Sequence, residues 1–145
     1  MSHIHRLRAS NRIFFVTVNL RRSVPVLHGS EYSTMIRVLE AARQRLGFLL
    51  CSYVLMPDHW HALVWTGYPQ TISQILYDVK KVSARRLHGK RGTEGPLWQH
   101  QFRDRFVRHA KEYEDRLEYM HLNPVRKGLV AKPQEWRWSS YNNFA

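Results

Sequence analysis

Two histidines separated by one tryptophan, His59 and His61, are the residues of this chain whose type and spacing point most directly to chemistry. They lie in an extended apolar segment that runs from Tyr53 to Trp65. Side chains two residues apart on a β-strand point to the same face of the sheet, so we expect both imidazoles on one face. Two neutral imidazoles that converge on one point can chelate a metal ion. The competing interpretation, equally common for such a pair, is two rings packed or hydrogen-bonded within the core.

A second set of reactive side chains falls in residues 111–123, where the spacing predicts a helix closed by Asn123-Pro124. Polar residues recur there at steps of three, four and four, on one helix face: Glu112, Asp115, Tyr119 and Asn123. A separate apolar stripe is formed by Tyr113, Leu117 and Met120. Tyr119 and Asn123 are thus expected to be neighbours, a phenol that can act as a nucleophile beside an amide oxygen that can complete a histidine metal site. Taken alone, Tyr119 is more simply an amphipathic surface residue.

The chemistry that these residues suit is attack on a phosphodiester. A metal that neutralises the nonbridging oxygens and aligns the phosphate lowers the barrier to attack electrostatically. Nitrogen ligands from His59 and His61 with an amide oxygen from Asn123 fit a divalent metal, Mg²⁺ or Mn²⁺. A tyrosine has an unperturbed pKa of about 10, so Tyr119 needs a proton acceptor or a nearby cation. Asp115, one helical turn earlier, is the candidate proton acceptor.

The elements that must position these residues follow from the hydrophobic periodicity and the turn signals. In chain order we expect a strand at 12–19, a helix at 30–46, strands at 48–56 and 59–66, a helix from 71 or 73 to 88, a short strand at 105–108 and a helix at 111–123. Gly47 is expected to stop the first helix, and Gly89 and Gly92 the second. The aromatic tail, residues 133–145, is expected to pack back on the body.

This order of strands and helices predicts an α+β fold. It fits a ferredoxin-like or RRM-like antiparallel β-sheet with α-helices packed mainly on one face, in one domain spanning residues 1–145. Such a sheet leaves its other face available to a ligand, as in sheets that bind single-stranded nucleic acid.

Composition predicts a polyanionic partner. The chain has 23 Lys and Arg against 11 Asp and Glu, a net charge of +12, which favours nucleic acid over an acidic membrane surface. Arginine outnumbers lysine seventeen to six, which favours bidentate phosphate contacts. The candidate DNA-binding residues are Arg6, Arg8, Arg12, Lys80, Lys81, Arg85, Arg86, Lys90, Arg91, Arg103, Arg105 and Arg108. The alternative for residues 80–91 is a solvated helix face. Aromatic residues that could stack on bases or pack in the core are Trp98, Phe102, Trp136 and Trp138.

The apolar runs are far shorter than the roughly 20 residues that span a bilayer, and the N-terminus lacks the apolar region of a secretory signal. We therefore expect no membrane association and a cytoplasmic location. The single cysteine, Cys51, lies in an apolar run and is expected to be a buried thiol in a reducing compartment.

Four motifs in order resemble the REP-associated tyrosine transposases, a branch of the HUH single-tyrosine transposase superfamily. The motifs are Tyr53-Val-Leu-Met-Pro-Asp-His-Trp-His61, Leu97-Trp-Gln-His-Gln-Phe-Arg103, Tyr119-Met-His-Leu-Asn-Pro-Val-Arg-Lys-Gly-Leu-Val130 and Trp138-Ser-Ser-Tyr141. The resemblance implies a transposase-like endonuclease and strand-transferase that cleaves single-stranded DNA near hairpins through a 5′-phosphotyrosine intermediate. It also implies that Tyr119 is the nucleophile and that His59, His61 and Asn123 bind the metal. Related insertion-sequence enzymes carry Gln at the position of Asn123, whereas the REP-associated branch carries Asn-Pro.

Two other classes of function remain open at this point. A sheet-based module that binds single-stranded nucleic acid without catalysis would explain the charge and the fold, but not the pairing of Tyr119 with Asn123. A metal-dependent hydrolase with an activated water would need further His or carboxylate ligands at motif spacing, which the sequence lacks. The sequence does not distinguish a monomer from a homodimer.

Overall fold

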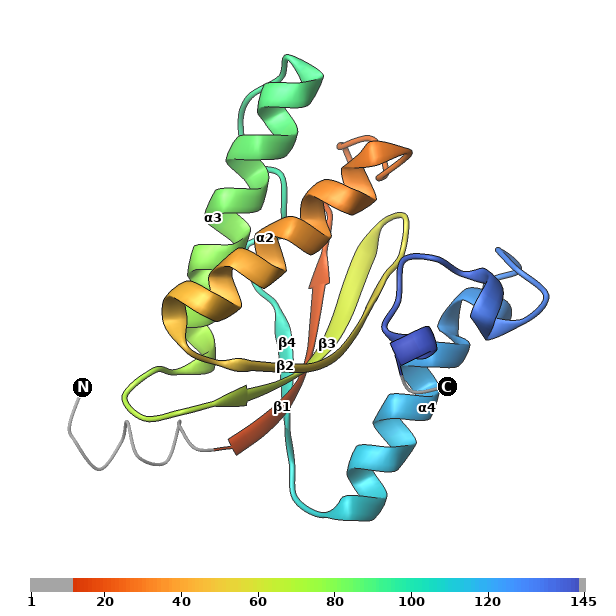
Figure 1. Cartoon of the computed structure of the whole chain (residues 1–145). Coiled ribbons are helices and arrows are strands. Elements are labelled where there is room, and N and C mark those ends of the chain that lie inside the picture. Colours follow the sequence, from red (N-terminus) through yellow and green to blue (C-terminus); the bar gives the residue numbers. More distant parts are fainter. Residues whose placement is uncertain (1–11, 144–145) are drawn as a thin grey trace.

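The structure, a computed structural model, describes residues 12–143. Its strands are β1 (Arg12–Asn19), β2 (Leu49–Leu55), β3 (His59–Thr66) and β4 (Arg103–Val107), and its helices are α2 (Ser30–Leu46), α3 (Ile72–Arg91) and α4 (Ala110–Arg126). Two short 3₁₀ helices, η1 (Pro133–Glu135) and η2 (Tyr141–Asn143), follow α4. The four strands form one antiparallel sheet in the order β2-β3-β1-β4 (Figure 1). The predicted α+β, ferredoxin-like class is confirmed.

The alternation of side chains along β1 separates two apolar cores, one on each face of the sheet. Phe14, Val16 and Val18 belong to the larger core, which also contains buried residues of α2 and α3. Phe15 points the other way, into a smaller core that includes Met120 of α4. Figure 1 accordingly shows α2 and α3 together on one side of the sheet and α4 apart from them. Two of these three helices thus pack on one face, and α4 lies across the other.

The same alternation of side chains along β3 determines which face of the sheet carries the histidines. Trp60, which is 1% exposed, belongs to the larger core, together with Ala62 and Val64. Residues between them on β3 point to the α4 face, where Leu63 joins the smaller core. His59 and His61 therefore share the face crossed by α4.

Helix ends agree with the glycine signals at two of three positions. Gly47 caps α2 in the left-handed conformation, with φ of 77°, as predicted. Gly92 caps α3 in the same way, with φ of 69° and its N–H bonded to the carbonyl of His88. The prediction that Gly89 also ends this helix is wrong, because α3 continues through it to Arg91. The last strand begins two residues earlier than expected, at Arg103, where it pairs with Thr17 of β1.

The expected end of α4 at Asn123 is also wrong. Pro124 lies inside the helix, which continues to Arg126. The helix closes further on with the pair of bonds of a Schellman motif: Gly128 N–H donates to Val125 O and Leu129 N–H donates to Pro124 O. Gly128 has φ of 73°, the left-handed conformation that this motif requires. Asn123 is therefore held within a continuous helix and not at a frayed end.

The C-terminal segment packs back on the body, as predicted. Leu55 N–H donates to Trp138 O at 2.8 Å, and Trp136 Nε1–H donates to Leu55 O at 2.9 Å. These bonds cover the edge of β2. Cys51, on the same strand, is only partly buried, and burial raises the pKa of its thiol. Within the part of the chain that the structure describes, no helix is both long and apolar enough to cross a membrane.

Candidate active site

Both histidines of β3 are held by hydrogen bonds at the Nδ1 atom. His61 Nδ1 lies 2.8 Å from Thr17 Oγ1, its register partner on β1, and His59 Nδ1 lies 2.7 Å from Asp58 Oδ1. The ring centroids of His59 and His61 are 4.8 Å apart. With Nδ1–H donating to these oxygens, the Nε2 lone pair of each ring is left for another partner. This is the arrangement in which histidine binds metal, since the bond at one nitrogen fixes the tautomer and the ring orientation.

The environment of His61 keeps its imidazole neutral. His61 is 5% exposed, and its ring stacks on that of Phe15 with the two centroids 5.2 Å apart. Burial, with a smaller contribution from the charge of His59, lowers the pKa of His61 from 6.5 to about 3. A neutral imidazole is the form that can donate a lone pair to a metal, so no proton has to leave His61 at neutral pH.

Tyr119 lies beside His61, although 58 positions separate them in the sequence. Its ring meets that of His61 edge-on with centroids 5.7 Å apart, and it meets Phe15 at 6.2 Å. Tyr119 is nevertheless 41% exposed, and the guanidinium of Arg126 lies 5.3 Å from its ring centroid. The phenol is thus accessible to a large substrate while the ring is anchored on the sheet.

Asn123, one helical turn after Tyr119, completes the group. It is 4% exposed, and among the described residues none forms a hydrogen bond with its side-chain amide. His59, His61, Tyr119 and Asn123 all line one pocket of about 560 Å³ between the sheet and α4. The structure therefore brings together all four residues that the sequence suggested for metal binding and nucleophilic attack.

The donor set in this pocket fits a hard or borderline divalent cation. Two imidazole nitrogens are oriented by bonds to Thr17 and Asp58, and one amide oxygen is available on Asn123. Across residues 12–143, no cluster of three or more His, Cys, Asp or Glu side chains could hold a metal. The Asn123 amide is a side chain of this pocket that could add a third protein contact to the two imidazoles.

The comparison with protein families decides what kind of protein carries this pocket. The model of a family described as "Transposase IS200 like" matches residues 10–121. The chain belongs to this family. His59, His61 and Tyr119 lie inside the matched segment, which ends shortly before Asn123.

Individual proteins similar to this chain are also described as transposases. A REP-associated tyrosine transposase of Escherichia coli (strain K12) is 25% identical over 142 residues, covering 98% of this chain and 84% of the relative. A relative from Haemophilus influenzae is 21% identical over 155 residues, covering 98% of this chain and 86% of that protein. A solved structure of a REP-associated tyrosine transposase bound to a REP hairpin has a TM-score of 0.82 at 22% identity, covering 92% of this chain and 79% of that one. The resemblance predicted from the sequence is confirmed.

Asp115, the predicted proton acceptor, lies apart from the pocket of this IS200-like protein. Its carboxylate accepts a hydrogen bond from Lys111 Nζ at 2.7 Å, and it is not among the pocket residues. Asp115 and Tyr119 lie one turn apart on α4, as the helical spacing predicted. Lys111, four residues before Asp115, engages this carboxylate on the exposed surface, a local i,i+4 contact that the same spacing allows.

The pocket also contains residues that the sequence did not single out for the site. Thr17 comes from the neighbouring strand and becomes identifiable only through the β1–β3 register. Arg116 lies three residues before Tyr119, so helical spacing could have found it, whereas Lys127 lies beyond the predicted end of the helix. The guanidinium carbon of Arg116 also lies 5.1 Å from the centroid of the Phe15 ring. With Arg103 and Arg105 from β4, these side chains give the pocket four cations against one carboxylate, Asp104.

Several of the candidate DNA-binding cations are engaged within the protein, among them Arg105, whose Nε donates to Glu112 Oε1 at 2.8 Å. Lys80 Nζ donates to the carbonyls of Gln99 and His100, and burial lowers its pKa. Arg91 forms an ion pair with Glu31 in which both side chains are at least nine-tenths buried. The guanidinium of Arg12 lies 4.4 Å from the centroid of Phe106.

The remaining candidate cations are placed differently. Arg6 and Arg8 lie outside the described residues. Exposed cations are found along α3 and around β4: Lys81, Arg85, Arg86, Lys90, Arg103 and Arg108. Of the aromatic candidates for base stacking, Trp98 is buried and donates to Ser83 Oγ, while Trp138 stacks on Tyr32. Phe102 and Trp136 also pack against the larger core, so these four rings serve the fold.

Proposed function

We propose that this protein is a metal-dependent single-stranded DNA endonuclease and strand-transferase that works through a covalent 5′-phosphotyrosine. One observation carries the proposal: His59, His61, Tyr119 and Asn123 line a single cationic pocket. These residues come from β3 and α4, and the pocket contains an accessible phenol, two oriented imidazoles and an amide that has no hydrogen-bond partner among the described residues. Membership in the IS200-like transposase family supports the same reaction class.

In the proposed cleavage step, Tyr119 Oη attacks the phosphorus of the scissile phosphodiester. The new bond joins Oη to phosphorus, and the bond from phosphorus to the 3′ oxygen breaks. That oxygen takes a proton and leaves as a 3′-hydroxyl, while the 5′ phosphate stays on Tyr119. Strand transfer is the reverse reaction with a different 3′-hydroxyl, which attacks the phosphotyrosine and releases the phenol.

His59, His61 and Asn123 are the residues proposed to hold Mg²⁺ or Mn²⁺. Bound there, the ion would neutralise the nonbridging oxygens of the phosphate and stabilise the charge that develops during attack. The hydrogen bonds that the two histidines form to Thr17 and Asp58 support this role, because they orient both imidazoles.

The pocket cations are proposed to supply the remaining electrostatic stabilisation. Arg116 of α4 and Lys127, the residue that caps the C-terminus of this helix, flank Tyr119 and Asn123, and both line the pocket. Positive charges close to the reacting atoms would stabilise the negative charge that develops as Tyr119 Oη attacks the phosphate. Asp115 is a weaker choice for the proton acceptor, because its carboxylate is already bonded to Lys111.

We further propose that the substrate contains a DNA hairpin. The support is that a solved relative with a TM-score of 0.82 is described as bound to a REP hairpin. The net charge of +12 and the exposed arginines around β4 suit a phosphate backbone.

The test is covalent capture of labelled single-stranded hairpin DNA in the presence of Mg²⁺ or Mn²⁺. We expect a denaturant-resistant protein–DNA adduct with the wild-type protein and its loss in Tyr119→Phe. Tyr113→Phe is the matched control, since Tyr113 lies on the same helix but lines a different hollow, and it should form the adduct normally. DNA binding without any adduct would favour a non-catalytic binding module, and cleavage that survives Tyr119→Phe would favour a hydrolase with an activated water.

A further inference from the structure

The active-site pocket is one end of a chain of three hollows that share residues. The pocket of about 560 Å³ that contains Tyr119 shares Asn19 and Arg103 with a second hollow of about 470 Å³. That second hollow shares Arg21 and Val24 with a third, of about 980 Å³. Neighbouring hollows therefore border the same residues, and we call this series, from the Tyr119 pocket to the C-terminal end of α3, the track.

The residues shared along this track are mostly polar or cationic. Arg103 lies at the first junction and Arg21 at the second, and the middle hollow also contains Arg22. All three arginines are exposed. Within the described chain none of the three has an ion-pair partner. Exposed arginines that the fold does not use are suited to bidentate contacts with phosphates.

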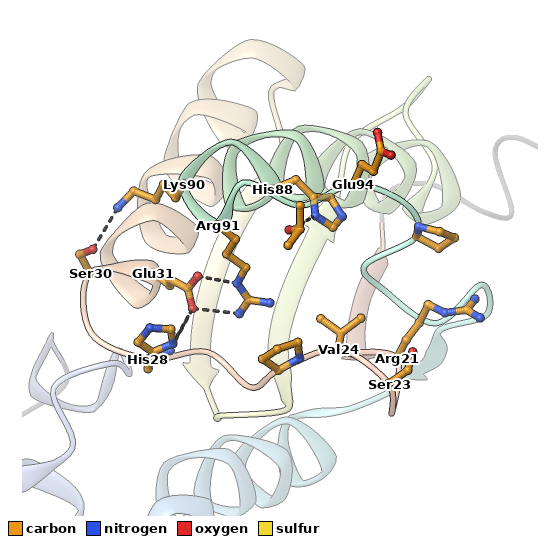
Figure 2. A pocket seen from close by; sticks show the side chains of 13 residues that line it. Arg21, Ser23, Val24, His28, Ser30, Glu31, His88, Lys90, Arg91 and Glu94 are labelled. Carbon is orange, nitrogen blue, oxygen red and sulfur yellow. Dashed lines mark hydrogen bonds and ion pairs between the residues drawn. The ribbon is translucent and has the colours of Figure 1, made fainter.

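The third hollow lies between the end of α3 and the segment that joins β1 to α2 (Figure 2). Its wall contains Arg91, whose Nε and Nη2 atoms donate to the carboxylate of Glu31. Nη1 of the same guanidinium is buried and has no hydrogen-bond partner among residues 12–143. Lys90 is exposed at the rim, where it donates to Ser30 Oγ at 3.0 Å (Figure 2). A buried donor without an acceptor costs free energy that an oxygen of a bound ligand would recover.

We propose that this track binds the single strand that flanks the cleaved phosphate. The strand leaves the Tyr119 pocket past Arg103, crosses the arginines at 21 and 22, and ends in the hollow beside Lys90 and Arg91. This inference rests on the proposed function, because it takes the Tyr119 pocket as the point where the phosphate is cleaved. A single strand suits the track better than a duplex, since hollows and exposed arginines can accommodate successive unpaired bases and phosphates.

The test uses Tyr119→Phe as the background, so that binding is measured without cleavage. Single-stranded DNA probes with the same core are extended stepwise, in one series on the 5′ side and in another on the 3′ side of the cleavage position. Affinity is measured for three further changes: Arg22→Ala at the middle of the track, Lys90→Ala at its far end and Arg37→Ala as an exposed control on α2 outside all three hollows.

We expect the sensitivity to appear in a fixed order in one of the two series. Short probes should bind all variants alike, longer ones should lose affinity severalfold with Arg22→Ala, and only the longest should also lose affinity with Lys90→Ala. Each sensitive variant should lower the slope of log K against log salt by about one, the value for one lost phosphate contact. Arg37→Ala should have no length-dependent effect.

The track proposal is overturned if Arg22→Ala and Lys90→Ala match Arg37→Ala at every length in both series, or if sensitivity to Lys90→Ala appears first. This result is distinguishable from failure of the proposed function. Wild-type protein that forms the Tyr119 adduct but shows no ordered sensitivity would retain the nuclease and lose the track. Ordered sensitivity without an adduct would retain a strand-binding track and lose the nuclease.

Discussion

Thr17 Oγ1 lies 2.8 Å from His61 Nδ1, across two paired strands of the sheet. This contact connects a residue without chemistry of its own to the ring on which the proposed metal site depends. It leaves Nε2 of His61 as the nitrogen available for a metal, because Nδ1 is occupied by the bond to the hydroxyl. A partly buried threonine in the middle of β1 is thereby part of the site.

Thr17→Val should weaken metal binding by about 10- to 100-fold, the usual effect of removing a hydrogen bond that orients a histidine ligand. Valine keeps the shape and the strand propensity of threonine but removes the hydroxyl. Titration of Mn²⁺ by calorimetry gives the affinity directly. Thr17→Ser keeps the hydroxyl and should remain within a few fold of wild type, so equal losses in both variants would assign the effect to packing.

Lys127→Met should reduce the rate of adduct formation by about tenfold, because it removes one pocket cation while keeping the aliphatic stem. Lys111→Met is the matched control on the same helix. Its ammonium pairs with Asp115 at the exposed surface and does not line the pocket, so the rate should change little. Single-turnover capture of labelled DNA measures both variants. A loss of the same size in Lys111→Met would show that the rate depends on the net charge of the protein and not on the position of Lys127.

Asp115→Asn should leave the rate of adduct formation within about twofold of wild type. Its carboxylate is more than half exposed, is bonded to Lys111 and does not line the pocket that contains Tyr119. The same single-turnover assay applies, followed across a range of pH. A rate that falls steeply, with loss of one ionisation from its pH profile, would restore Asp115 as the proton acceptor.

Glu31→Gln should lower the free energy of unfolding by about 3 kcal/mol near neutral pH, because it leaves the buried guanidinium of Arg91 without its partner. The hydrogen bonds from Arg91 hold the pKa of Glu31 below its ordinary value of 4.5. This ion pair therefore stabilises the fold fully above the pKa of the unfolded carboxyl and loses its contribution as pH falls through the lowered, folded value.

The difference between wild type and Glu31→Gln should consequently shrink as the pH is lowered from about 7 to below the folded pKa of Glu31. Urea unfolding at a series of pH values measures it. Glu40→Gln is a suitable control, since its partner Arg43 is exposed on the same helix, and the change should be small at every pH. A difference that stays constant with pH would show that Glu31 contributes through shape and not through its charge.

The sequence predicted β1, which carries Thr17, and β3, which carries the two histidines, with the correct bounds, because residues 12–19 and 59–66 are rich in β-branched and aromatic side chains. It also related Tyr119 to Asn123, since their spacing of one turn is local. Only the family resemblance predicted that Tyr119 and Asn123 would lie beside the two histidines, because the crossing of α4 over the sheet depends on the whole fold. The roles of Thr17 and Arg91 depend on strand register and on a pairing with Glu31 across 60 positions, which local patterns do not contain.

Pro124 shows a different limit. A proline normally ends a helix near the residue before it, and this rule predicted an end at Asn123. In the structure the helix passes through the proline and ends only at the Schellman bonds, in which Gly128 and Leu129 donate to the carbonyls of Val125 and Pro124. The metal-ligand candidate Asn123 is thus supported from its C-terminal side by residues that the sequence interpretation had assigned to no element.

Gly128→Ala should therefore destabilise the protein by about 1 kcal/mol, because an alanine is strained at φ of 73°. Gly89→Ala provides a control of opposite sign. Gly89 lies inside α3 with open space around its Cα, so alanine should stabilise the helix by about 0.5 to 1 kcal/mol. Urea unfolding at neutral pH measures both. If the end of α4 also positions Asn123, Gly128→Ala should weaken Mn²⁺ binding as well, whereas Gly89→Ala should leave it unchanged. Destabilisation without any change in Mn²⁺ affinity would confine the Schellman motif to a role in folding.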